Sequence, residues 1–219
     1  MKKTSLFNSV LLILIVISCL FYIVYDGLNL KGMTSLIFLV LGFVNLLTVK
    51  NDANKDQFII CLFIGLVFAF FADILIEINM ISGFILYYLT LTFMFVSFCK
   101  TEEFQVKDII YSFAVLIPCI MFILYTKKLD FGSEVIQDLS LGYAVIFSGV
   151  IGKSISNFIS NKSKLNLMIL VSCLLLFTSN FCSMFVLFAE AGKLVKVFSI
   201  IFYYCALTML ALTICYTEE

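Results

Sequence analysis

Long apolar blocks separated by short polar connectors make up this chain. Eight blocks can be placed, at residues 6–25, 33–49, 58–78, 80–99, 109–126, 137–159, 165–188 and 194–216. A helix needs about 17–25 apolar residues to cross the hydrocarbon core of a bilayer. The pattern therefore predicts an all-α polytopic bundle of eight membrane-spanning helices.

The connectors are too short for a soluble domain, so the sequence predicts one membrane domain over residues 1–219. The longest connector runs only from Lys127 to Gln137. The third and fourth blocks almost meet at Asn79, which predicts a tight helical hairpin. Residues 1–19 have the basic start and apolar run of a signal peptide. Because more membrane segments follow, we interpret them as part of the first span.

Composition supports a membrane protein. Hydrophobic residues make up 63% of the chain and charged residues 13%, with a mean hydropathy of +1.16. A soluble domain needs more polar residues than this to cover its core. The formal net charge is zero, so no nucleic-acid partner is expected.

Several kinds of chemistry are excluded or disfavoured. Without histidine, the chain can form neither Ser–His nor Cys–His nucleophile pairs, nor the usual zinc sites. All eight cysteines fall in apolar blocks and no CxxC pair occurs, so they are interpreted as small apolar helix residues. We therefore expect no metal and no cofactor.

The lysines predict an orientation. With the N-terminus inside, nine lysines fall in inner segments (Lys2, Lys3, Lys50, Lys55, Lys100, Lys107, Lys153, Lys162 and Lys164) and five in outer ones (Lys31, Lys127, Lys128, Lys193 and Lys196). Positive charge favours the cytoplasmic side, so both termini are predicted there. The wealth of Phe, Ile, Leu, Lys and Asn resembles that of a low-GC bacterium, which suggests its plasma membrane.

Asp73 is the main candidate for function. It lies in the third block, in the run GLVFAFFADILIE of residues 65–77. A charged side chain at the centre of a membrane helix costs about 2.5–3.5 kcal/mol on insertion scales and usually faces a polar cavity. The alternative is a structural hydrogen bond between helices. Glu77 shares the helical face of Asp73, one turn nearer the outer interface. It either belongs to the same site or contacts water at the interface.

Asn180 is the predicted partner of Asp73. On the predicted topology the third and seventh spans both run outward, and Asp73 and Asn180 lie fifteen residues beyond Phe58 and Leu165. Equal depth makes a shared pocket plausible. The matching places of these spans in two sets of four suggest a parallel repeat, although chance coincidence gives the same pattern.

Other polar residues near this depth are candidate pocket walls. Ser179 precedes Asn180, and Tyr203 and Tyr204 lie on the last span. Hydroxyls between membrane helices also serve in packing, and tyrosines are common at membrane interfaces. Tyr87 and Tyr88 on the fourth span share this ambiguity.

Four short motifs resemble the YhhN family of eight-span membrane proteins, which includes the animal lysoplasmalogenases. The first motif comprises GLVF at residues 65–68 and ADIL at residues 72–75, followed by Gly83. FTSN at residues 177–180 resembles a Phe-x-x-Ser-Asp motif but is one residue shorter, and residues 203–207 resemble Tyr-x-x-Ala-Gln. Lys31, just before the second block, resembles the lysine of a family Lys-Pro pair, with Gly32 in place of the proline.

The departures fall at positions where chemistry is expected. Asn180 stands in place of the second family aspartate, Leu207 in place of a glutamine, and Ala72 in place of a glycine. Leu91 lies near the position of a family histidine.

The resemblance implies a lysophospholipid or similar amphiphile as substrate. It implies hydrolysis of the vinyl ether bond of lysoplasmalogen to a fatty aldehyde and a glycerophospho-alcohol. Asp73 would supply the proton, since a buried carboxyl group can stay protonated near neutral pH. Asn180 would orient water or Asp73, because an amide cannot act as a base. Two alternatives stay open: a non-catalytic lipid-binding relative and a small-solute transporter.

Overall fold

The computed structural model describes residues 2–48, 53–126 and 129–215, and these form an all-α bundle. Its helices are α1 (Lys2–Tyr25), α2 (Leu28–Thr48), α3 (Ala53–Ile78), α4 (Met80–Thr101), α5 (Val106–Tyr125), α6 (Glu134–Ser160), α7 (Lys164–Phe188) and α8 (Lys193–Thr213). All eight are long and apolar enough to cross a membrane. The predicted spans are therefore confirmed.

Helix α2 begins earlier than the hydropathy pattern predicts. Only Asp26 and Gly27 separate it from α1, and both have a positive φ, of 45° and 152°. The Lys31 backbone N–H then donates to the Gly27 oxygen at 3.0 Å. Lys31 therefore lies in the first turn of α2 rather than in a connector. Of the lysines used for the predicted orientation, Lys50, Lys127 and Lys128 lie outside the described residues.

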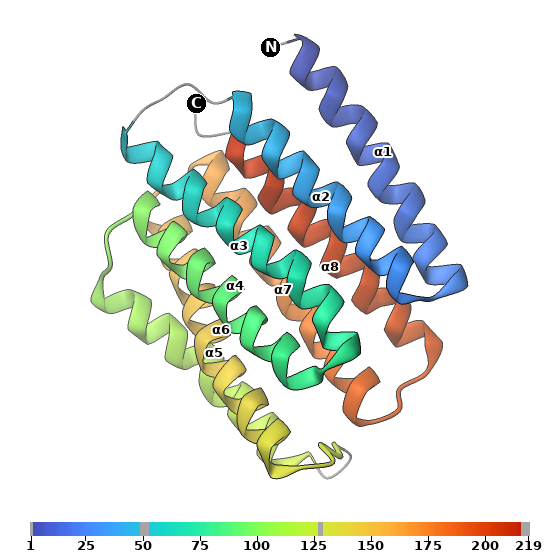
Figure 1. The fold of residues 1–219 in the computed structure, drawn as a ribbon. Helices are drawn as coiled ribbons and strands as arrows, with labels where there is room; N and C mark the ends of the chain where they lie inside the picture. Colours follow the sequence, from blue (N-terminus) through green and yellow to red (C-terminus); the bar gives the residue numbers. More distant parts are fainter. Residues whose placement is uncertain (1, 49–52, 127–128, 216–219) are drawn as a thin grey trace.

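Successive helices run antiparallel, so α1 begins and α8 ends at the same end of the bundle (Figure 1). We call the opposite end, which holds the α1–α2, α3–α4, α5–α6 and α7–α8 connections, the hairpin end. In each half the first helix packs on the second, the second on the third and the third on the fourth. Across the halves, α1 and α3 touch α8 without counterparts in the described residues of the second half, but α2 packs on α8 as α6 packs on α4. These matched contacts agree with a parallel repeat of four plus four helices.

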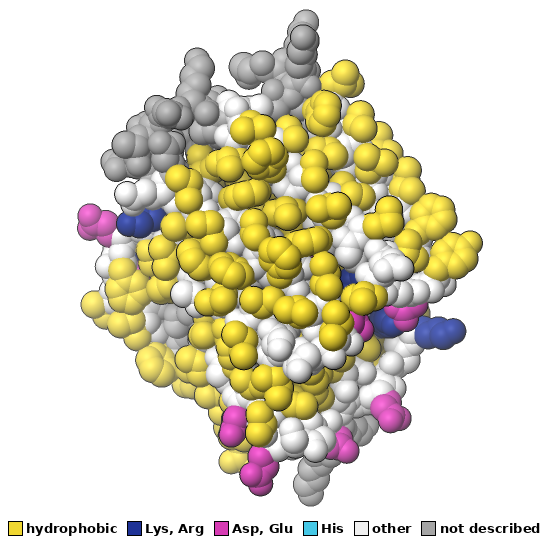
Figure 2. Space-filling model, viewed as in Figure 1, with side chains coloured by type: hydrophobic (Ala, Val, Ile, Leu, Met, Phe, Trp, Pro, Cys, Tyr) yellow, Lys and Arg dark blue, Asp and Glu magenta, His cyan; other side chains and the backbone are white. Residues whose placement is uncertain are grey.

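The outer surface of the bundle is apolar. In Figure 2, hydrophobic side chains cover the middle of the visible face and charged side chains lie toward its rim. Helix α5 is the least buried of the eight spans and exposes Ile110, Phe113 and Ile117. A surface of this kind is stable against lipid hydrocarbon rather than water.

The α3–α4 hairpin is closed by a very tight helix contact. The Asn79 side chain caps α4 by accepting from the Ser82 backbone N–H at 3.1 Å. A Cβ atom on Gly83 would lie 2.5 Å from the Ile76 Cα atom, so only glycine fits there. Since Asp73 lies one turn before Ile76 and Tyr87 one turn after Gly83, this contact also brings Tyr87 opposite Asp73.

We expect Gly83→Ala to destabilise the bundle by about 1–3 kcal/mol, because the obstructing atom is backbone and cannot rotate away. Gly149→Ala is the matched control, since the Cβ there would meet only Phe95 ring atoms at 3.9 Å. Thermal unfolding in detergent micelles measures both. Equal unfolding midpoints for the two variants would contradict the tight α3–α4 contact.

Candidate functional site

Asp73 is fully buried and is surrounded by hydroxyl groups from three other helices. It lies near the C-terminal end of α3, toward the hairpin end, with none of its surface exposed. Its Oδ1 atom accepts hydrogen bonds from Tyr87 Oη on α4 at 2.6 Å and from Tyr203 Oη on α8 at 2.7 Å. Its Oδ2 atom is hydrogen-bonded to Ser35 Oγ on α2. Both carboxyl oxygens thus have partners.

Tyr204 extends this network away from Asp73. Its hydroxyl lies 3.2 Å from Ser35 Oγ and donates to the Lys31 backbone oxygen at 3.3 Å. Its ring packs against Tyr22 and Phe38, each with a centroid distance of 6.4 Å. We call Ser35, Asp73, Tyr87, Tyr203 and Tyr204 the Asp73 cluster.

A more exposed ion pair borders the cluster on its hairpin-end side. Lys31 Nζ lies 2.8 Å from Glu77 Oε1, and the two side chains are 14% and 50% exposed. The Lys31 ammonium is also close enough to act electrostatically on Asp73. A second pair, Lys196 with Asp26, lies in the exposed rim. This side of the cluster is therefore its charged, water-accessible boundary.

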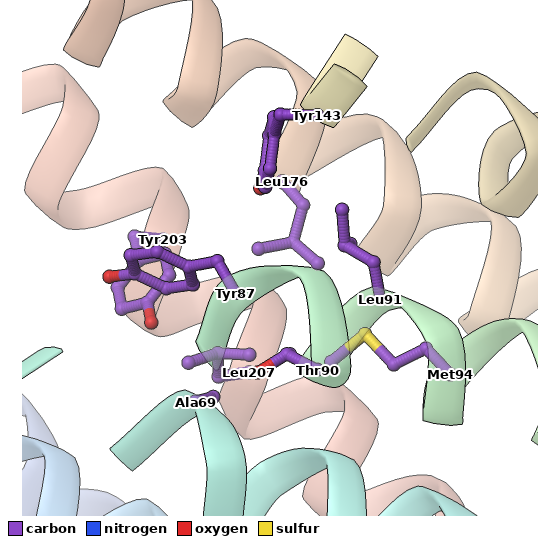
Figure 3. A pocket seen from close by; sticks show the side chains of 9 residues that line it. All are labelled: Ala69, Tyr87, Thr90, Leu91, Met94, Tyr143, Leu176, Tyr203 and Leu207. Atoms are coloured by element: carbon purple, nitrogen blue, oxygen red, sulfur yellow. The ribbon is translucent and has the colours of Figure 1, made fainter. Parts of the chain in front are cut away.

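A small cavity adjoins Tyr87 and Tyr203 on the side toward the middle of the bundle. The other lining residues are Ala69, Thr90, Leu91, Met94, Tyr143, Leu176 and Leu207. It offers about 10 Å³ to the centre of a water molecule, roughly what one water needs. In Figure 3 the two phenol rings lie together, with their hydroxyls on the side away from Leu91 and Met94. Apolar side chains dominate the rest of the wall.

The predicted site residues fall into two groups. Tyr203 donates a hydrogen bond to Asp73, and Tyr204 contacts Ser35, which is itself bonded to Asp73. Glu77 is paired with Lys31 at the border of the Asp73 cluster. The structure does not bring Ser179 and Asn180 to the Asp73 cluster.

Asn180 lies beside Tyr143, and Ser179 Oγ donates to the Ser199 backbone oxygen at 2.9 Å. In the described residues α3 and α7 do not pack on each other. The Tyr87 and Tyr143 rings lie between the two groups, with centroids 6.5 Å apart. The catalytic roles assigned to Asp73 and Asn180 stay predictions.

Sequence reasoning missed Ser35 and left Tyr87 undecided. Ser35 lies four residues after Lys31, so both are on one face of α2. Hydropathy predicted that this helix begins at residue 33, which placed Lys31 in a connector and not on the same helix as Ser35. The two tyrosines of α4 differ in the structure: Tyr87 bonds Asp73, whereas Tyr88 donates to the Leu139 backbone oxygen.

A second buried carboxyl group lies at the opposite end of the bundle and has a structural role. Lys153 Nζ lies 2.9 Å from Asp108 Oδ2, with both side chains 1% exposed, and also donates to the Glu103 backbone oxygen at 2.8 Å. Asp108 accepts from the Gln105 backbone N–H at 2.8 Å as part of a capping box. This pair fastens the start of α5 to α6.

Fold and site together define an all-helical, multi-pass integral membrane protein with a buried carboxyl group surrounded by hydroxyls. No family model, no curated protein and no solved structure matches the chain.

The two ion pairs should differ strongly in their contribution to stability. Lys153→Met leaves the Asp108 carboxylate buried without a counter-charge, and we expect a loss of about 3–5 kcal/mol. Lys31→Met leaves the half-exposed Glu77 in contact with water, and we expect a loss below about 1 kcal/mol. Chemical unfolding in mixed micelles compares them. Equal losses would refute the assignment of Lys153 as the structural anchor.

Proposed function

We propose that this protein hydrolyses the vinyl ether bond of a lysoplasmalogen-type lysophospholipid, with Asp73 as the acid. The observation that carries the proposal is a completely buried carboxyl group held by three hydroxyls inside a membrane bundle. The motif resemblance to the YhhN family supports the same reaction. The products would be a fatty aldehyde and a glycerophospho-alcohol.

This reaction suits a site with an acid and no activated nucleophile. Ester or amide cleavage usually uses a nucleophile with an adjacent base, and the chain has no histidine to supply that base. A vinyl ether needs only a proton on its outer vinyl carbon, which turns the ether into an oxocarbenium ion. A carboxylate beside that cation stabilises it strongly in a low-dielectric site.

Asp73 can serve in both halves of the reaction. It first gives its proton to the vinyl carbon and becomes a carboxylate, while Tyr87 and Tyr203 donate hydrogen bonds to it. Water then adds to the carbon of the oxocarbenium ion, and the proton that this water loses returns to Asp73. The resulting hemiacetal breaks into aldehyde and alcohol as its hydroxyl proton moves to the leaving oxygen. No second carboxylate is needed, so Asn180 is compatible with turnover.

The charged boundary provides a place for the head group. Lys31 and Glu77 offer one positive and one negative charge, which match the phosphate and amine of a phosphoethanolamine group. Lys31 and Ser35 lie one turn apart on α2, about 5–6 Å between their Cβ atoms. This spacing suits the glycerol backbone between the phosphate and the vinyl ether oxygen. The ether would thus reach Asp73 when the phosphate contacts Lys31.

Turnover of lysoplasmalogen by purified protein in nanodiscs tests the proposal. We expect release of fatty aldehyde, and a rate at least about 100-fold lower for Asp73→Asn, because general acid catalysis commonly contributes 10²–10⁴-fold. Asp138→Asn makes the same change at an exposed position and should keep the wild-type rate. Aldehyde release that is unaffected by Asp73→Asn, or no release by the wild type, would exclude this function.

A second candidate is a non-catalytic protein that binds a lipid. Leu91 and Leu207 favour it, because they make the cavity wall apolar where the resemblance places a histidine and a glutamine. Asn180→Asp separates the two candidates. For a hydrolase that works through Asp73 alone, we expect a rate close to that of the wild type. An inactive wild type with an active Asn180→Asp variant would indicate a binding protein that has lost one carboxylate.

A further inference from the structure

The hydrogen bonds around Asp73 require more protons than its neighbours carry. On one side, Oδ1 accepts from both Tyr87 and Tyr203, which uses its two lone pairs. On the other side, a chain of contacts joins Asp73 Oδ2 to Ser35 Oγ, Ser35 Oγ to Tyr204 Oη, and Tyr204 Oη to the Lys31 backbone oxygen. Each of these three contacts is a full, unshared hydrogen bond only if it has its own proton.

Ser35 and Tyr204 supply only one proton each, and a backbone oxygen supplies none. If Asp73 were ionised, Ser35 would donate to it. The single Tyr204 proton would then serve one of the 3.2 Å contact with Ser35 and the 3.3 Å contact with the Lys31 oxygen, or be divided between them as two weaker bonds. With a proton on Asp73 Oδ2, all three hydrogen bonds form: Asp73 donates to Ser35, Ser35 donates to Tyr204, and Tyr204 donates to the Lys31 backbone oxygen.

The charges around Asp73 lead to the same assignment. The titratable or charged side chains around Asp73 are Tyr22 from α1, Lys31 from α2, Tyr87 from α4, and Tyr203 and Tyr204 from α8, with Glu77 one turn further along α3. Lys31 is already paired with Glu77 at 2.8 Å, so its positive charge is shared between two carboxyl groups and does not belong to Asp73 alone. An ionised Asp73 would be a buried charge without its own counter-charge, which proteins avoid.

We infer that Asp73 is a neutral carboxylic acid whose proton lies on Oδ2 and points at Ser35, with Ser35 and Tyr204 as positioning residues. The hydroxyls of Ser35 and Tyr204 orient this proton toward α2 and α8, and Tyr87 and Tyr203 hold the carbonyl oxygen. The inference deepens the proposed function, on which its catalytic meaning rests. The proton that reaches the substrate is on the side of Lys31, so the ether approaches there by displacing the Ser35 hydroxyl.

Infrared spectroscopy of protein labelled with ¹³C-aspartate tests the protonation state in nanodiscs at neutral pH. We expect a carboxylic acid C=O band that is absent from Asp73→Asn. Tyr203→Phe should move this band to higher frequency, because Tyr203 bonds the carbonyl oxygen. Tyr204→Phe makes the same change at the next residue and should move it less. Absence of any acid band that depends on Asp73 would overturn the inference.

Stability gives a second test. An asparagine at position 73 can accept from Tyr87 and Tyr203 through its oxygen and donate to Ser35 through its amide, as the neutral acid does. We expect an unfolding midpoint within about 2 °C of the wild type for Asp73→Asn. Asp108→Asn, the same change beside Lys153, should lower the midpoint by about 5 °C or more. A loss for Asp73→Asn as large as that for Asp108→Asn would mean that Asp73 makes bonds that a neutral amide cannot replace, and would overturn the assignment.

Neither measurement uses substrate. An Asp73 acid band without aldehyde release would support the proton assignment and remove the proposed function. Aldehyde release that depends on Asp73, without the band, would keep the function and remove the assignment of the resting proton.

Discussion

The site depends on the constraint that a carboxyl group inside a membrane bundle must have its hydrogen bonds satisfied by the protein. Asp73 has no exposed surface, and its partners are the hydroxyls of Ser35, Tyr87 and Tyr203. Because water is excluded, each of these bonds is strong and each missing one would be expensive. The same bonds hold α2, α4 and α8 around α3. The hydrogen bonds of Asp73 thus both form the site and hold these helices together.

The two halves of the bundle are similar in packing, yet within residues 2–48, 53–126 and 129–215 the site on α3 has no counterpart on α7. In the described residues, α3 approaches α8, whereas the corresponding helices α7 and α4 do not meet. That extra contact brings Tyr203 to Asp73. In the second half, Asn180 occupies the comparable helix and lies beside Tyr143. Helix α3 thus carries a buried acid bonded to hydroxyls, whereas α7 carries an amide at the comparable position.

Hydropathy predicted every helix, because lipid contact demands long apolar segments whatever their tertiary contacts. The sequence also pointed to Asp73 as a residue with polar partners, because an unpartnered carboxyl group in a membrane span is costly. Ser35 was not, because one small hydroxyl in an apolar helix leaves no pattern in the sequence.

The pairing of Asp73 with Asn180 shows another limit of the sequence. Counting along a span predicts depth in the membrane, but it does not predict which helices are neighbours. Two residues at equal depth can lie on helices that never touch, as α3 and α7 do in the described part of the chain.

The proposed role of Asp73 is to protonate a carbon atom, and hydrolysis in D₂O tests this most directly. Mass spectrometry of the aldehyde formed from lysoplasmalogen should find one deuterium on the carbon next to the carbonyl when the wild type is used. The Asp73→Asn variant, with an unchanged unfolding midpoint, should form no aldehyde above background. Deuterated aldehyde formed at the wild-type rate by Asp73→Asn would contradict the account.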